Sequence, residues 1–177
     1  RIILASISGF GQDGPYVKRP GFDQIAQGMG GMMSITGEPG TGPMRAGIAV
    51  ADSSAGLYAA LGIMIALLER EKSGEGQWVQ SSLLHAMIAM CDFQAARFLM
   101  TGEIPPQAGN DHPTSTPMGA FKANDGYFNI GASGTAQYRA LCDAIERPDL
   151  RDDPRYEKND GRYKDRPRLN AELNKEF

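Results

Sequence analysis

Residues 44–70 read MRAGIAVADSSAGLYAALGIMIALLER, and this stretch decides the fold and carries one isolated carboxylate. A short apolar run over 48–51 leads to Asp52, and small residues at 53–56 precede a long apolar pattern. An aspartate at such a point is typical of a helix N-cap, because its oxygen accepts the free N–H groups of the first turn. A nucleophile held at the positive end of a helix suits the same position. Both roles stay open from these residues, and the local pattern favours the cap.

The long apolar pattern predicts a helix that is buried on most of its circumference. Its apolar residues follow the i, i+3, i+4, i+7 spacing of a helix, at Leu57, Ala60, Leu61, Met64, Leu67 and Leu68. The run over 53–68 is shorter than the roughly 20 residues that a membrane span needs, so we expect no membrane partner. Gly74 predicts a glycine cap at the end of this helix. We therefore expect the helix inside a layered fold.

Strand and helix patterns alternate around this central helix. The expected elements are a strand over 2–6, a helix over 24–33, the central helix, a strand over 77–81 and a helix over 82–100. This alternation predicts an α/β fold around a mostly parallel sheet. The loop over 8–15 is rich in glycine and follows the first strand, where α/β folds present ligand sites. Gly9, Gly11 and Gly14 have the GxGxxG spacing, but a polar connection over 16–23 follows them in place of a helix, so a dinucleotide-binding fingerprint is not supported.

The composition changes after the second helix. Prolines and glycines are frequent over 103–117, which predicts a linker or an active-site loop between a first domain at 1–102 and a second at 118–177. The second domain is expected to be α+β. Its predicted elements are a hairpin around Asn124-Asp125-Gly126, a helix over 135–145 with Ser133 as its cap, and a charged surface helix over 162–177.

Composition and charge exclude several classes of function. The chain has 177 residues and a formal net charge of −3, and it has no basic run, so nucleic acid is not expected as a partner. Its two cysteines, Cys91 and Cys142, have no CxxC spacing and indicate neither a disulfide framework nor a zinc site. No signal peptide is evident, so a cytoplasmic location is expected. The chain opens inside a strand pattern without Met, and we expect it to be part of a longer polypeptide.

A series of short motifs runs through the whole chain. They are, in order, 6–15, Arg19–Asp23, Thr36-Gly37-Glu38, Ala51-Asp52, Gly74 to Gln77, Ser82-Leu83-Leu84, Gly109-Asn110, Ala120-Phe121 and Asp125-Gly126-Tyr127. Taken together, these motifs resemble the class III CoA-transferases, the family of formyl-CoA transferase and carnitine CoA-transferase. The resemblance covers the whole chain and implies a middle portion of the family's architecture. It implies a Rossmann-like large domain, the start of a small α+β domain, and an interlocked homodimer in the full-length protein.

The resemblance gives Asp52 the chemical role. It implies that Asp52 attacks an acyl-CoA thioester to give an aspartyl mixed anhydride, that the released CoA thiolate forms an aspartyl-CoA thioester, and that an acceptor carboxylate then takes over the CoA. A carboxylate is ionised at neutral pH without a partner base, so no Ser-His or Cys-His pair is required. His85 and His112 are the only histidines and suggest no such pair. The resemblance implies no cofactor, because the CoA thioester is itself a substrate.

Further residues match family positions with weaker support. Phe22 matches an aromatic residue beside the pantetheine and the thioester, Asp23 an acidic neighbour, and Leu83 an apolar residue near the nucleophile. For Phe22 and Leu83, ordinary core packing explains the residues equally well. Arg19 matches a position that could meet a CoA phosphate, but a solvated loop charge is favoured.

The loop over 109–116 aligns with the loop that closes over the active site in this family. In formyl-CoA transferase that loop is a run of glycines, and here it is not, which argues against formyl or oxalate specificity. The resemblance implies that His112 and Thr114 read the acyl group or the acceptor carboxylate. A plain surface-loop role fits them equally well.

Two other functions remain as alternatives. The first is α-methylacyl-CoA racemase of the same superfamily, which uses a histidine in a Gly-His-Asp motif. Here the motif is Gly21-Phe22-Asp23, and phenylalanine cannot move a proton. The racemase glutamate would fall near 133–135, which contains no acid. The second alternative is a non-catalytic CoA-binding subunit in which Asp52 is only a helix cap.

Overall fold

The computed structural model describes residues 1–177, and the chain divides into two compact units, 1–107 and 108–177. The boundary falls inside the predicted connecting segment 103–117. Both units mix helices with strands, so the predicted α/β class is confirmed. The two units are described separately below.

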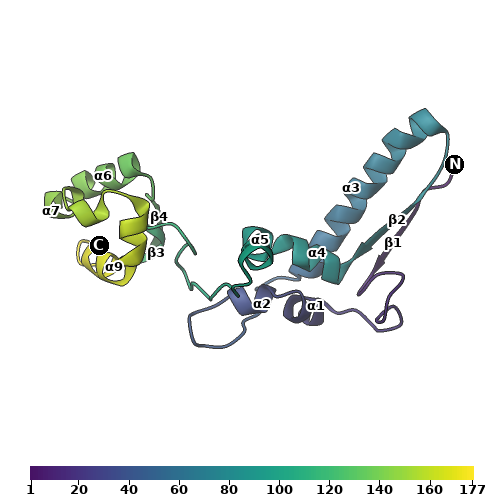
Figure 1. Ribbon diagram of the computed structural model, residues 1–177, viewed down its shortest axis with the longest axis horizontal. Coiled ribbons are helices and arrows are strands. Elements are labelled where there is room, and N and C mark those ends of the chain that lie inside the picture. The colour runs from purple at the N-terminus through teal and green to yellow at the C-terminus, as the bar shows by residue number, and fades with distance from the viewer. The chain divides into compact units, whose positions relative to one another are not determined.

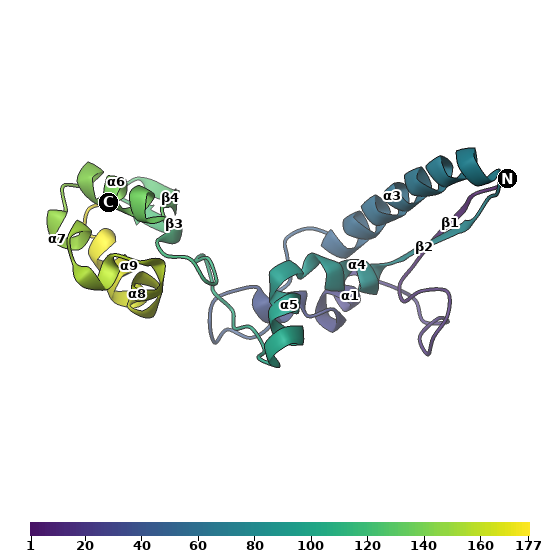
Figure 2. The same ribbon diagram turned by 45° about the horizontal axis from the view of Figure 1, so that its top comes forward.

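The first unit is built on a pair of parallel strands. The strands β1 (Leu4–Ser8) and β2 (Trp78–Ser82) pair in register, with Leu4 opposite Trp78. The helices α1 (Asp23–Met29), α2 (Met32–Ile35) and α3 (Val50–Ser73) lie between them in sequence, and α4 (Leu83–Met90) and α5 (Asp92–Thr101) follow. Figures 1 and 2 both show α3 lying along this strand pair. The predicted alternation of strands and helices is therefore present, with small shifts at the ends of the elements.

The central helix α3 is longer and more exposed than predicted. It has 24 residues and ends, as predicted, at Gly74, which has a left-handed conformation. Its buried face consists of small side chains, at Ala51, Ser54, Ala55, Ala59 and Ala66. Gly62 continues this face, because a Cβ there would collide with the side chain of Val79 on β2. The helix thus packs on the strands through its small residues, which allow a close approach.

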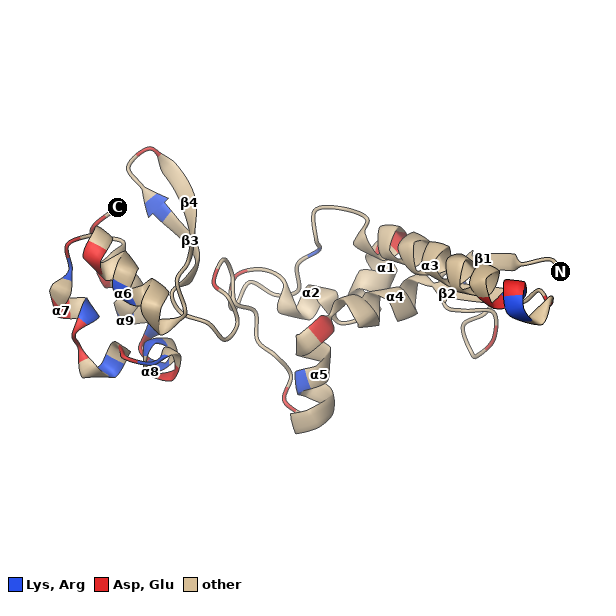
Figure 3. Ribbon diagram, turned by 90° about the horizontal axis from the view of Figure 1, so that it is seen from above, with Lys and Arg blue, Asp and Glu red and all other residues tan.

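The large apolar side chains of α3 lie on the other side and are exposed. They are Leu57, Leu61, Met64, Ile65 and Leu68, each more than half exposed. The prediction that α3 is buried on most of its circumference is therefore wrong for this chain, because its neighbours cover only the small-residue face. Figure 3 shows no charge along the middle of α3. By length and composition α3 could cross a membrane, so the length argument against a span fails, but a core helix of a globular protein meets the same criteria.

Two predicted helices are each divided by a backbone break. The helix predicted over 82–100 is bent by 82° between α4 and α5, where Asp92 has a positive φ of 48°. The helix predicted over 24–33 is divided at Gly31, which has a φ of 91°. Periodicity misses such breaks, because apolar residues continue on both sides of them.

Two glycines from separate motifs touch in the first unit. A Cβ added at Gly21 would collide with the Cα of Gly9, and one added at Gly9 would collide with Gly21. The Gly9 carbonyl also accepts a hydrogen bond from the Leu84 N–H at the start of α4, at 3.1 Å. This contact brings the loop after β1 against the chain that enters α1.

Replacing Gly21 by alanine should therefore destabilise the protein. The new methyl group forces the two backbones apart, and overpacking of this kind costs about 1–3 kcal/mol of the free energy of unfolding. Thermal and denaturant unfolding of the full-length protein measure this loss. The control is Gly28→Ala on α1, where a Cβ would make only an ordinary contact with the sulfur of Met33 at 3.6 Å. Equal stability of the two variants would contradict the close approach.

The second unit is a hairpin packed against short helices. The strands β3 (Met118–Ala123) and β4 (Gly126–Gly131) pair antiparallel across Asn124 and Asp125, so the predicted hairpin is confirmed. The helices are α6 (Thr135–Ala144), α7 (Pro148–Arg151), the 3-10 turn η1 (Pro154–Tyr156), α8 (Asn159–Lys164) and α9 (Arg166–Leu173). The core contains Phe121, Ile130, Tyr138, Cys142, Leu150, Tyr156, Leu169 and Leu173. The N-cap of α6 is Gly134 and not the predicted Ser133.

The charged surface helix predicted over 162–177 is wrong. Two short helices, α8 and α9, replace it, and Arg162 of α8 is fully buried. The Arg162 guanidinium donates to the carbonyls of Thr116 and Tyr156, at 2.9 and 2.7 Å, and also to those of Ser133 and Glu157. It also lies over the ring of Tyr138. Burial lowers the pKa of Arg162. The pattern of charged residues over 162–177 does not reveal that Arg162 is buried and binds backbone carbonyls.

Candidate functional site

Asp52 lies in the first turn of α3, but it is not the N-cap. The helix begins at Val50 with Ala49 as its N-cap, so Asp52 is its third residue. The Ser53 N–H donates to the Ala49 carbonyl at 3.0 Å, which is the first bond of the helix. The Asp52 side chain is exposed and has no hydrogen-bond or ion-pair partner within the chain. The prediction of a capping role is therefore wrong, and the carboxylate is left available at the positive end of a helix.

The cap of α3 comes instead from another helix. Asp23, the first residue of α1, is nearly buried, and its Oδ1 accepts the Ala51 N–H at 2.8 Å. Ala51 is the second residue of α3, so Asp23 pairs one of the free amides of that helix. Ala49, at the N-cap itself, has no side-chain acceptor. The residue predicted to be an acidic neighbour of the substrate thus binds the backbone directly before Asp52.

A buried glutamine completes this junction. Gln27 is fully buried on α1, and its Nε2 donates to Asp23 Oδ2 at 2.7 Å and to the Ile48 carbonyl at 3.2 Å. Its Oε1 accepts the Ala46 N–H at 2.9 Å. Arg45 adds an ion pair to Asp23 Oδ2 at 3.3 Å. All the polar atoms of Gln27 are therefore used to hold the segment that leads into α3.

The core around the start of α3 contains Leu83. It is buried together with Ala26, Ala51, Ala55, Ala86 and Met87. Leu83 begins α4 next to the fully buried Ser82, whose Oγ accepts the His85 N–H at 3.2 Å. Leu83 therefore packs beside the backbone that carries Asp52. Its role in binding a substrate stays a prediction.

Phe22 and Arg19 are exposed in the same unit. Phe22 is the N-cap of α1, and the residue is 63% exposed. It directly precedes Asp23, so an exposed aromatic ring and a buried carboxylate come from adjacent residues. The Arg19 guanidinium lies 4.1 Å from the centre of the Tyr16 ring. The structure brings Phe22, Asp23 and Leu83 to the elements around Asp52, and it places Arg19 on the loop that precedes α1.

His112 and Thr114 belong to the second unit. The Nδ1 atom of His112 accepts the N–H groups of Thr114 and Ser115, both at 3.2 Å. An imidazole whose Nδ1 is an acceptor carries its proton on Nε2 in the neutral form. His112 is half-buried and Thr114 is exposed. The imidazole therefore organises the backbone of its own loop.

This loop is held firmly by α8 and α9. The Asn159 amide accepts the Thr116 N–H at 2.9 Å and donates to the Thr114 carbonyl at 3.0 Å. Arg166 donates to Thr116 Oγ1 at 3.0 Å and to the His112 carbonyl at 2.8 Å. The loop over 109–116 is therefore held by side chains of α8 and α9, and it is not the run of glycines found in formyl-CoA transferase.

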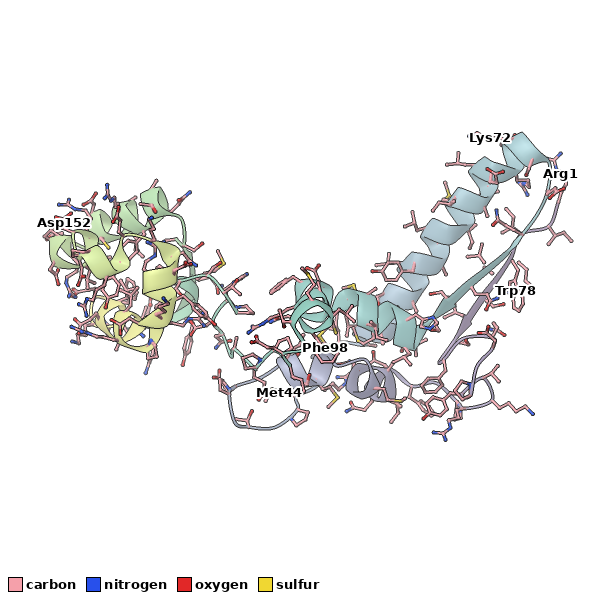
Figure 4. The ribbon with its side chains drawn as sticks, viewed as in Figure 1. Arg1, Met44, Lys72, Trp78, Phe98 and Asp152 are labelled. Atoms are coloured by element: carbon pink, nitrogen blue, oxygen red, sulfur yellow. The ribbon has the colours of Figure 1, made fainter.

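The first unit also contains an apolar cavity of about 380 Å³. Met29, Ile35, Ile88, Phe98, Leu99 and Ile104 line most of it. Figure 4 labels Phe98 on α5. Cys91 is the only thiol there, and burial raises its pKa, which disfavours the thiolate. None of the predicted site residues lines this cavity, so it is separate from the predicted nucleophile Asp52.

Two residues of the junction were missed from the sequence. Gln27 lies in the helix predicted over 24–33, and Arg45 lies in the quoted central stretch without a motif of its own. The spacing of Asp23 and Gln27, four residues apart on one helix, was the available signal, because such residues share a face. No sequence pattern indicated that the face shared by Asp23 and Gln27 contacts the backbone before Asp52.

The match to known proteins decides the family. The family model described as CoA-transferase family III matches residues 1–177, which is the whole chain. The chain belongs to CoA-transferase family III. The resemblance inferred from the motifs is therefore confirmed.

Relatives of this CoA-transferase family III chain have named activities. A succinate–glutarate CoA-transferase of Agrobacterium fabrum is 41% identical over 162 residues, covering 92% of this chain and 40% of that protein. The human succinyl-CoA:glutarate CoA-transferase is 35% identical, with coverages of 99% and 40%. A CaiB/BaiF family protein from Brucella suis has a solved structure with a TM-score of 0.82 and 37% identity, with coverages of 99% and 46%. The chain thus spans less than half the length of these proteins.

Proposed function

We propose that the protein is an acyl-CoA:carboxylate CoA-transferase in which Asp52 is the nucleophile. The observation that carries this proposal is an exposed carboxylate without a partner, at the start of α3, in a chain that belongs to CoA-transferase family III. Asp23 and the buried Gln27 bind the backbone directly before Asp52, at Ala51 and Ile48. A carboxylate needs positioning and desolvation to attack a thioester, and it needs no base.

The proposed reaction has two halves. An Asp52 oxygen attacks the thioester carbonyl, the C–S bond breaks, and an acyl-aspartyl anhydride and CoA thiolate form. The thiolate attacks the aspartyl carbonyl, which releases the donor acid and gives an aspartyl-CoA thioester. The acceptor carboxylate then attacks this thioester, and the thiolate that leaves captures the acceptor acyl group from the new anhydride. Atoms and charges balance, and no cofactor or metal is required.

A small dicarboxylic acid is the proposed acceptor. The names of the two relatives described above contain succinate or succinyl-CoA and glutarate, which are short dicarboxylates. Because this chain is similar to both relatives, we propose a short dicarboxylate as its acceptor as well. We further propose that the full-length protein is a cytoplasmic interlocked homodimer, in line with the resemblance described from its motifs.

One assay on the full-length protein tests this proposal. The protein is incubated with succinyl-CoA and a panel of acids that includes glutarate, mesaconate, oxalate and acetate, and the CoA esters formed are identified by mass. Hydroxylamine added during turnover should convert the activated Asp52 to its hydroxamate. A protein that forms no new CoA ester and no hydroxamate would not be a CoA-transferase of this mechanism.

The racemase alternative has a separate readout. Racemisation of a 2-methylacyl-CoA in D₂O puts deuterium at the α-carbon, whereas CoA transfer does not. Phe22 occupies the position of the histidine that a racemase uses and cannot move a proton. We therefore expect transfer without deuterium uptake. A non-catalytic CoA-binding subunit would show neither reaction.

A further inference from the structure

The buried junction between α1 and α3 is held by side-chain hydrogen bonds to the backbone. Asp23 of α1 bonds the Ala51 N–H, and Gln27 of the same helix bonds both the Ala46 N–H and the Ile48 carbonyl. Figure 1 shows α1 near the start of α3. Two side chains of one helix therefore hold three backbone groups of the segment 46–51.

These contacts end one residue before Asp52. The anchored amide belongs to Ala51, which is fully buried in the core beside Leu83. Asp52 itself is exposed and has no contact that would orient it. The position from which its side chain starts is thus set by the backbone, and the backbone is held by Asp23 and Gln27.

We infer that Asp23 and Gln27 are positioning residues for Asp52 and not contacts to the substrate. This inference rests on the proposed function, because it concerns the geometry of the same nucleophile. The oxygens of Asp23 are already used, with Oδ1 on Ala51 and Oδ2 shared between Gln27 and Arg45. Gln27 is fully buried and has no surface to offer to a substrate.

The hydrogen-bond partners of Asp23 explain why a carboxylate suits this position. Three N–H donors converge on Asp23, and an ionised carboxylate accepts them all without an unpaired proton. Its charge also suits the N-terminus of α3. Asp23 therefore accepts a free N–H group of α3, as the side chain of an N-cap residue usually does. The Asp52 side chain is not needed for that hydrogen bond.

Kinetics of full-length variants test the inference. Asp23→Ala should lower kcat about 10²-fold, the loss expected for a displacement near 1 Å, while the KM values for acyl-CoA and for the acid change less than about threefold. Asp23→Asn keeps an oxygen for the Ala51 N–H but turns an NH2 group toward the donors Gln27 and Arg45, so it should recover only part of kcat. Gln27→Leu should lower kcat in the same way, to a smaller extent. Gln94→Leu is the matched control, because Gln94 is also a buried glutamine but its Oε1 has no partner.

Amide hydrogen exchange gives a readout that does not depend on activity. Exchange at Ala51 should become faster in Asp23→Ala and stay near the wild-type rate in Asp23→Asn and Gln94→Leu. If the wild-type protein transfers no CoA, the proposed function fails, and the exchange data still decide whether Asp23 anchors α3. If Asp23→Ala does not fold, Gln27→Leu and Asp23→Asn carry the test.

Two results would overturn the inference. A rise of the acceptor KM by tenfold or more in Asp23→Asn, with wild-type exchange at Ala51, would make Asp23 a substrate contact. Wild-type kcat in Gln27→Leu would show that the junction does not control the nucleophile.

Discussion

Replacing Asp52 by alanine or asparagine is expected to reduce CoA transfer by at least about 10³-fold, because the covalent route then has no nucleophile. The side chain is exposed and has no partner, so neither substitution should change the free energy of unfolding appreciably. Steady-state rates with succinyl-CoA and the best acceptor acid measure the loss, and thermal unfolding checks the fold. The hydroxylamine adduct should also disappear.

The matched control is Asp92→Asn. Asp92 is likewise an exposed acid in the first turn of a helix, but on α5. Its substitution removes the same charge from a similar environment and should leave transfer unchanged. Equal losses in the two variants would indicate a general electrostatic effect, and full activity of Asp52→Ala would remove the basis of the proposed mechanism.

Replacing Arg162 by methionine is expected to have the largest effect on stability. The guanidinium pairs with several backbone carbonyls inside the second unit, including those of Thr116 and Tyr156. Each buried carbonyl left unpaired costs about 1–3 kcal/mol, so the unit should lose at least about 3 kcal/mol of its free energy of unfolding. Methionine fills part of the volume but donates no hydrogen bond. Denaturant unfolding and amide exchange in the loop at 114–117 measure the change.

Arg168→Met provides the comparison for this substitution. Arg168 lies on α9 and is exposed, so its replacement should change stability by less than about 0.5 kcal/mol. If Arg162→Met unfolds at the same denaturant concentration as Arg168→Met, the buried guanidinium is not a structural link. Loop exchange that rises only in Arg162→Met would connect this arginine to the loop that carries His112.

Local signals predicted several elements correctly. The glycine after Ser73 ends α3, the Asn124-Asp125 turn joins β3 and β4, and the apolar runs form β1 and β2 with small shifts. These features depend on residues that are close in sequence, such as a glycine with positive φ or alternation along a strand. The breaks before α2 and after α4 were missed, because they leave the apolar periodicity intact.

Asp52 could be singled out from the sequence, because a lone acid between an apolar run and a helix of small residues is a distinctive pattern. The environment of Asp52 could not be predicted from the sequence. Whether Asp52 caps its own helix depends on where α3 begins, and that start is held by residues about 25 positions away, at Asp23 and Gln27. The covered face of α3 was predicted wrongly, because both its alanines and its leucines follow helical spacing and together indicate burial on most sides.

The sequence by itself therefore determined the alternation of strands and helices in the first unit, the hairpin of the second, the family and the candidate nucleophile, because each is encoded in short runs of residues. The tertiary structure alone decided that Asp23 caps α3, that Arg162 is buried among carbonyls, and that Asp52 has no partner. The physical reason is that a buried polar group must pair with whatever backbone the fold brings to it, and that partner is distant in the chain.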